Sequence, residues 1–217
     1  PWTIELTVVS LVIGVLIGVP LGVWSAVNRN RMPDYVTRIA SLLGLSFPPF
    51  VSAIILLIVF AIMLRWFPVI SAGRGSVSAW FQSMALPALN LGLIMAAYIT
   101  RVARSAMLEV MQEDYVRSAR AKGVPWRVVI WRHALRNALI PIITIVGLYL
   151  GILIGNSVLT EIVFNRPGLG KLIVGALNQR DYTMLQGLMV IYTLIVVLVN
   201  IATDITYALV DPRVKLS

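Results

Sequence analysis

Five long apolar runs, separated by shorter polar segments, make up most of this chain. They cover approximately Leu6–Val27, Ile39–Leu64, Met84–Thr100, Leu139–Leu159 and Leu185–Val210. Each has about the 20 residues that a helix needs to cross the hydrocarbon core of a bilayer. None alternates between apolar and polar positions as the strands of a membrane barrel do, and only helices and closed barrels satisfy their own backbone hydrogen bonds in lipid. The pattern predicts an all-α integral membrane protein with five spanning helices.

Composition agrees with this class. Hydrophobic residues make up 59% of the chain and charged residues 12%, compared with about 45–50% and about 25% in soluble domains. The net charge of +9 also occurs in nucleic-acid-binding proteins, but here the positive residues gather in alternate loops, so we expect no nucleic-acid partner. No cysteine is present, which excludes disulfides and thiolate metal sites.

Lysine and arginine fall into two unequal sets of loops. Thirteen of the 18 lie between the first and second runs, between the third and fourth runs, or in the C-terminal tail. The remaining five are Arg65, Arg74, Arg166, Lys171 and Arg180. Because positive residues accumulate on the cytoplasmic side, the larger set and the C-terminus are predicted to be cytoplasmic. Residue 1 is then outside, so we expect a further spanning helix and an outer segment before Pro1, giving six helices in the full chain.

Glycine recurs every four residues in two of the runs. The positions are Gly14, Gly18 and Gly22 in the first run, and Gly147, Gly151 and Gly155, followed by Asn156, in the fourth. Such stripes let membrane helices approach closely. One interpretation is packing within one subunit, and the other is contact with a partner subunit or the translocation path.

Two adjacent prolines, Pro48 and Pro49, lie in the second run within Ser46–Phe50. Each lacks a backbone donor, which predicts a break near the cytoplasmic third of this run. Broken membrane helices often border cavities. Both prolines are therefore candidates for the translocation path.

No nucleotide, metal or catalytic site is evident. The string PGLGKL at residues 167–172 resembles a phosphate-binding loop, but Asn165 replaces the first glycine of that motif and Leu172 replaces the Ser or Thr that holds magnesium. His133 is the only histidine, which excludes a histidine cage for a metal. We expect no enzyme activity, metal or cofactor on this chain.

Ionisable groups inside the predicted spans are few. Asp204 lies near the cytoplasmic end of the last run, at a depth comparable to Arg101 and Arg104, and this position favours a paired or hydrogen-bonded packing role. A proton-driven pump usually needs a chain of intramembrane carboxylates, which this sequence lacks. The energy for transport must therefore come from elsewhere.

The basic, alanine-rich segment Glu113–Pro141 is too long for a simple turn. Acidic residues at its start and basic residues towards Lys122 favour a helix. Gly123 fits a left-handed C-terminal cap, and Pro125 fits the first turn of a second helix leading into the fourth run. Small side chains at this turn would let a partner's cleft close around it. We call residues 101–138 the coupling segment.

At these residues the chain resembles the permeases of binding-protein-dependent ABC importers. In the signature of that family, the second alanine, the glycine and the leucine correspond to Ala119, Gly123 and Leu135. The glutamate, first alanine, isoleucine and proline are replaced by Arg117, Ser118, His133 and Arg136. The strings DYVRSARAKGV, RHALRNALIP, RNRMPD, SFPPF, TEIVFNRPGLGKL, RDYTMLQG and DPRV are similar to the B-type subunit of the dipeptide, oligopeptide and nickel branch.

This resemblance implies a single transmembrane domain over residues 1–217, a polytopic helical bundle of the type I importer (MetI-like) kind, in a bacterial or archaeal cytoplasmic membrane. The implied partners are a second homologous permease, two ATPase subunits that carry ATP and magnesium, an extracytoplasmic substrate-binding protein and membrane lipid. Peptides or related small solutes are the implied cargo. The residues implied to dock on the ATPase are Tyr115, Ser118, Ala119, Arg120, Ala121, Lys122, Gly123, Val124, Pro125, His133 and Leu135.

Two other interpretations stay open. The chain could belong to a secondary transporter or channel, although it shows no charged relay and no inverted repeat. The basic loop could also serve only as a topology signal on anionic lipid, which accounts for its charge but not for the turn between Gly123 and Pro125.

Overall fold

The computed structural model describes residues 1–69 and 76–210, except for the side chains of Asp204 and residues 206–210. The role expected for Asp204, the outer position of Arg74 and the DPRV string therefore lie outside the described residues. The described part is helical, with π-helical segments written η: α1 (Trp2–Val27), α2 (Met32–Ser46), α3 (Pro49–Leu56), η1 (Leu57–Met63), α4 (Val77–Val110), α5 (Asp114–Ala121), α6 (Trp126–Val128), η2 (Val129–Ala134), α7 (Leu135–Val163), α8 (Leu169–Asn178) and α9 (Tyr182–Val210).

Four of the five predicted spans are confirmed as single helices. Within the described ranges, α1, α4, the helix Trp126–Val163 and α9 are long and apolar enough to cross a membrane. Two of them extend well past the apolar runs: α4 and Trp126–Val163 both continue through the polar sequence that was predicted to be cytoplasmic. A helix keeps its internal hydrogen bonds outside lipid as well, so the apolar run predicts the span and underestimates the helix.

The second predicted span is broken. Its two arms, α2 and the pair α3–η1, meet at an angle of 102°, which confirms the interruption predicted at the two prolines. Neither Pro48 nor Pro49 can donate a backbone hydrogen bond. Asn90 of α4 stabilises the break, because its Nδ2 donates to the Pro49 carbonyl (3.0 Å) and its Oδ1 accepts from Ser52 Oγ (2.7 Å).

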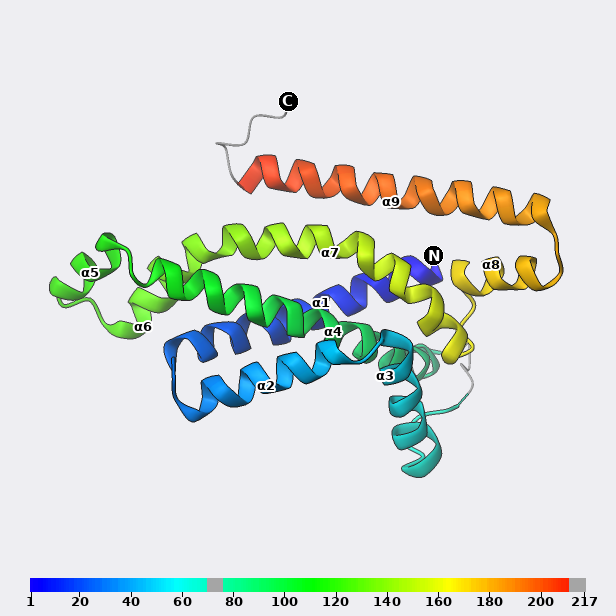
Figure 1. Ribbon diagram of the computed structural model, residues 1–217, viewed down its shortest axis with the longest axis horizontal. Coiled ribbons are helices and arrows are strands. Elements are labelled where there is room, and N and C mark those ends of the chain that lie inside the picture. The colour runs from blue at the N-terminus through cyan, green and yellow to red at the C-terminus, as the bar shows by residue number, and fades with distance from the viewer. Residues whose placement is uncertain (70–75, 211–217) are drawn as a thin grey trace.

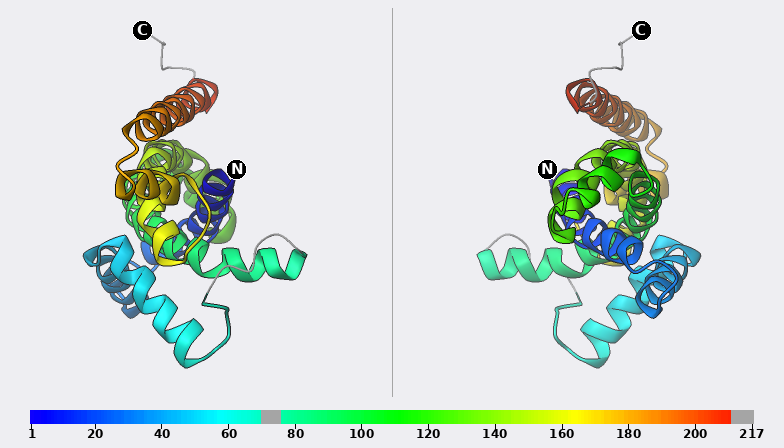
Figure 2. Two further views of the ribbon diagram at one scale, coloured as in Figure 1. Left: turned by 90° about the vertical axis from the view of Figure 1, so that its right-hand side faces the viewer. Right: turned by 90° about the vertical axis from the view of Figure 1, so that its left-hand side faces the viewer.

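The centre of the molecule is a bundle of α1, α4 and α7 (Figure 1). Buried side chains from all three helices, among them Leu6, Leu91, Met95 and Leu153, form its main apolar core. In the end-on views, α2 and α3 lie on one side of this bundle and α9 lies on the other (Figure 2). Only a small part of α9 is buried.

The glycine stripe of α1 lies against α4. A Cβ atom added at Gly14 would be 2.7 Å from Met95 Cγ, one at Gly18 would be 2.7 Å from Ile99 Cβ, and one at Gly22 would be 2.5 Å from Ala103 Cβ. Real Cβ atoms do not approach that closely. The backbones of α1 and α4 can approach this closely only because these three positions have no side chains.

Candidate functional site

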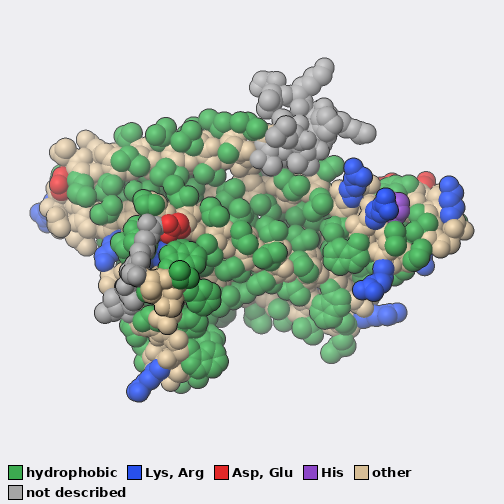
Figure 3. All heavy atoms as spheres, turned by 180° about the vertical axis from the view of Figure 1, so that it is seen from behind, with side chains coloured by type: hydrophobic (Ala, Val, Ile, Leu, Met, Phe, Trp, Pro, Cys, Tyr) green, Lys and Arg blue, Asp and Glu red, His purple; other side chains and the backbone are tan. Residues whose placement is uncertain are grey.

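The coupling segment projects from one end of the bundle, where α4 passes into α5 and the chain returns through α6 and η2 (Figure 1). Lysine and arginine side chains gather at this end, on the right in Figure 3. The opposite end holds α8 and the first residues of α1 (Figure 1).

The turn after α5 has the geometry of a glycine cap. Gly123 has φ +79°, its N–H donates to the Arg120 carbonyl (2.9 Å), and the Val124 N–H donates to the Ala119 carbonyl (3.2 Å). This pair of bonds forms a Schellman motif, in which a left-handed residue ends the helix. The predicted cap is confirmed. Pro125 lies one position earlier than expected, directly before the first turn of α6.

Side chains hold α5 in place against the returning helix. Val116 is buried, with 1% of its surface exposed. Tyr115 Oη accepts a hydrogen bond from Asn137 Nδ2 (2.7 Å), and the Arg120 guanidinium lies 4.5 Å from the centre of the Trp126 ring. The sequence analysis missed the supporting residues Val116, Trp126 and Asn137, because their pairing across the turn depends on how the two helices fold together.

The predicted docking residues separate into two groups. Those that face outward on α5 and the turn are Tyr115, Ser118, Arg120, Ala121, Lys122, Gly123 and Pro125, and Ala119 and Val124 are half-buried. His133 and Leu135 are half-buried on the η2–α7 helix, and Leu135 packs on the two apolar clusters of the bundle. The exposed docking surface on α5 and the turn is therefore small and basic. His133 and Leu135 belong instead to the helix that supports it.

An ion pair that the sequence analysis did not predict lies at the same end. Arg104 of α4 donates from Nε to Asp34 Oδ1 (2.6 Å) and from NH2 to Asp34 Oδ2 (2.8 Å). Asp34 is fully buried and also accepts from Ser25 Oγ (2.7 Å) and the Asn30 N–H (2.9 Å). This cluster joins α1, α2 and α4 at the start of the coupling segment.

The PGLGKL string lies at the opposite end and has a structural role. The buried Glu161 carboxylate accepts from the Gly170 N–H (2.9 Å), and a Cβ atom at Gly168 would collide with this carboxylate. The equally buried Arg166 donates from NH1 to the Ser83 carbonyl (3.1 Å). The space that glycines leave for phosphate in nucleotide-binding loops is here occupied by Glu161.

The candidate path residues lie in three places. Gly14, Gly18 and Gly22 are covered by α4, whereas Pro48 and Pro49 form the break described above. Gly147 lies against the Thr203 side chain of α9, Gly151 faces Asn200 and Gly155 faces Tyr192, and Asn156 is half-buried. Within the described residues, no three His, Asp or Glu side chains gather as a metal site would require.

The described residues thus form an integral membrane bundle of spanning helices with an ordered, basic helical turn at one end. Residues 18–216 match the family described as the binding-protein-dependent transport system inner membrane component. The chain belongs to this family, which decides against a secondary transporter or channel.

Two similar proteins extend this finding. A Brucella ovis protein named as a peptide permease is 42% identical over 219 residues, covering 99% of this chain and 69% of its own length. The glutathione transport system permease protein GsiC of Escherichia coli (strain K12) is 40% identical over 213 residues, covering 98% of this chain and 68% of its own length.

Among solved structures, a chain of the MetNI methionine ABC transporter in an inward-facing conformation has the same fold. Its TM-score is 0.74 at 22% identity, over 96% of this chain and 93% of that chain. The predicted MetI-like helical bundle is therefore confirmed.

Proposed function

We propose that this chain is the permease subunit of an ATP-driven importer of peptides or a related small solute, and that the turn after α5 transmits the force of ATP hydrolysis. Its partners are a second homologous permease, two ATPase subunits that carry ATP and magnesium, and an extracytoplasmic substrate-binding protein. Family membership and relatives named for peptide and glutathione transport support this assignment.

The observation that supports the coupling role is the open space around Gly123. Apart from Gly123 and its two chain neighbours, no heavy atom lies within 4 Å of a Cβ added there, so packing inside this chain does not require glycine. Only the left-handed backbone does. A sharp, small turn on a firmly supported helix is suited to insertion into a cleft on another subunit.

The test is Gly123→Val. Forcing a β-branched residue into left-handed backbone costs about 1–2 kcal/mol, which is enough to shift the turn while the spanning helices stay folded. We expect normal membrane insertion together with loss of ATPase co-purification or ATP hydrolysis without solute uptake. Asn tolerates this conformation better, so Gly123→Asn should retain more uptake than Gly123→Val.

The matched control is Gly187→Val near the start of α9. This glycine also has open space around its Cβ position, but it lies at the opposite end of the bundle and has no positive φ. It should keep ATPase binding and uptake. Normal coupling in Gly123→Val would refute the role of this turn.

Cargo needs its own experiment. Uptake of labelled dipeptide, longer peptide and reduced glutathione should be compared in membrane vesicles that contain the complete transporter and its binding protein. ATP-dependent accumulation of at least one of them is expected. Uptake that persists without ATP, or none for all three, would contradict the proposal.

A further inference from the structure

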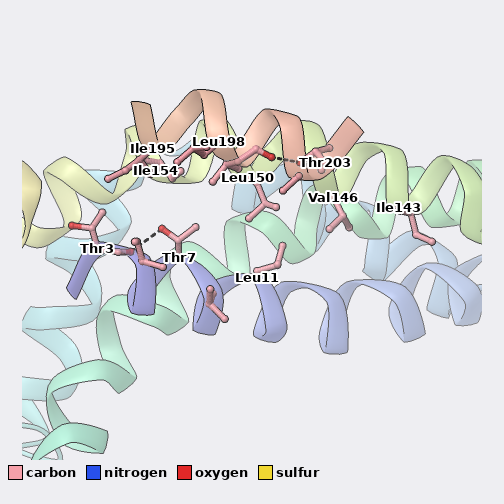
Figure 4. A pocket seen from close by; sticks show the side chains of 15 residues that line it. Thr3, Thr7, Leu11, Ile143, Val146, Leu150, Ile154, Ile195, Leu198 and Thr203 are labelled. Carbon is pink, nitrogen blue, oxygen red and sulfur yellow. Dashed lines mark hydrogen bonds between the residues drawn. The ribbon is translucent and has the colours of Figure 1, made fainter. Parts of the chain in front are cut away.

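Helix α9 stands apart from α1, and a groove between them is open along the molecule. Two adjoining cavities form it: one of about 530 Å³ between α1, α7 and α9, and one of about 650 Å³ that continues past α8 towards the outer end. Thr3, Ile4 and Ile195 line both. Figure 4 shows side chains from all three helices pointing into the first cavity.

The walls of the inner cavity are suited to hydrocarbon. They are formed largely by aliphatic side chains such as Leu150 and Leu198. Its hydroxyl groups already have partners: Thr7 Oγ1 donates to the Thr3 carbonyl (2.9 Å) and Thr203 Oγ1 donates to the Val199 carbonyl (2.8 Å). A polar solute would lose its hydrogen bonds to water here and gain none in return.

The outer end of the groove is different, because a cation lines it. Lys171 is exposed and borders the second cavity. Its ammonium group has three donors, and one of them is directed to Asn165 Oδ1. The others can bind an anionic oxygen. The groove thus joins an apolar channel inside the bilayer to a positive charge at its outer boundary.

We propose that this groove binds one anionic phospholipid, with an acyl chain between α1 and α9 and the phosphate group at Lys171. The volumes lie within the roughly 300–1,000 Å³ of ordinary ligand sites. Complementary charge selects an anionic lipid over a zwitterionic one. The lipid would supply α9 with apolar contacts on the side where it does not touch α1. This inference is independent of the cargo and of the role of Gly123.

The test uses the intact transporter, purified through a tag on this chain and placed in nanodiscs of phosphatidylethanolamine with or without phosphatidylglycerol. Native mass spectrometry then counts retained lipids. We expect one retained phosphatidylglycerol for each copy of this chain. Val8→Trp, which fills the inner cavity, should lower its occupancy about tenfold, on the scale of one overpacked side chain.

The matched control is Val12→Trp on the same helix. Val12 is 48% exposed and Val8 is 50% exposed, but Val12 lines neither cavity. It should retain the lipid, which separates loss of the site from a general effect of tryptophan.

The headgroup is tested by Lys171→Gln. Losing one charge near the surface should lower the preference for phosphatidylglycerol over phosphatidylethanolamine about fivefold. Lys171→Arg should restore it. Arg180→Gln, which removes another exposed charge that lines neither cavity, should leave the preference unchanged.

Two results would overturn the proposal. One is equal lipid retention in Val8→Trp and Val12→Trp. The other is a photo-reactive residue at Leu198 that cross-links to protein instead of lipid, since a further helix or a second permease subunit would then fill the groove.

Discussion

Both carboxylate oxygens of Asp34 accept hydrogen bonds, and the residue is fully buried. Two bonds from Arg104, one from Ser25 and one from the Asn30 N–H surround its carboxylate. Removing one partner of a buried ion pair leaves an uncompensated charge. The cluster therefore fixes α4 to the α1–α2 turn at the start of the coupling segment.

We expect Asp34→Asn to lower the free energy of unfolding by about 3 kcal/mol, at the lower end of the range for breaking a buried pair, because the Arg104 side chain is still 21% exposed. Thermal unfolding in detergent would measure this. In a double-mutant cycle with Arg104→Gln, the two losses should not add.

The exposed pair of Asp114 and Arg117 provides a comparison on α5. Its atoms are 3.6 Å apart and its side chains are 97% and 72% exposed. Solvent screens such pairs, so Asp114→Asn should leave the unfolding temperature unchanged. Equal effects at Asp34 and Asp114 would show that burial does not strengthen the Arg104 pair.

Among the elements, α1 and α4 are the most closely joined, and the reason is the glycine stripe. Gly18 also accepts, through its carbonyl, a hydrogen bond from Thr100 Oγ1 (3.3 Å). Between membrane helices there is little hydrophobic drive, so close van der Waals packing supplies the attraction. A methyl group added at one of these glycines would force apart the backbones of α1 and α4 as well as their side chains.

Gly22→Ala should therefore destabilise the protein by about 1–3 kcal/mol, as overpacking does, since its Cβ would lie 2.5 Å from Ala103 Cβ and 2.8 Å from the Thr100 carbonyl oxygen. Gly187→Ala in α9 has open space and should cost nothing. Comparing their unfolding temperatures checks this, and a Gly22→Ala protein as stable as Gly187→Ala would contradict tight packing.

At the scale of the whole molecule, the asymmetry of positive charge predicts which end of the bundle is cytoplasmic. Cysteines introduced at Ser76 and Asn165, both exposed, should react with a membrane-impermeant reagent in intact cells. One at Ser118, exposed on α5, should react only after permeabilisation. Labelling of Ser118 in intact cells would reverse the predicted topology.

Much of the architecture could be predicted from local sequence. The apolar runs indicated five spans, four of which are single helices, because length and hydropathy decide whether a helix can cross a bilayer. The two adjacent prolines indicated the break before α3, and Gly123 with its basic helix indicated the cap, since both depend on backbone properties of single residues. The 102° bend itself was beyond this reasoning, because Asn90 on another helix helps to determine it.

What the sequence by itself determined is thus the class, the spans and the position of the turn, all of which follow from bilayer thickness and local backbone preferences; the topology stays a prediction from charge placement. Only the tertiary structure decided that Arg104 pairs with Asp34, 70 residues away, that Glu161 occupies the glycine-rich loop and that α9 leaves a groove beside α1. Each of these depends on which helix faces meet, and one chain's pattern of apolar residues leaves that choice open because almost every face of these helices is apolar.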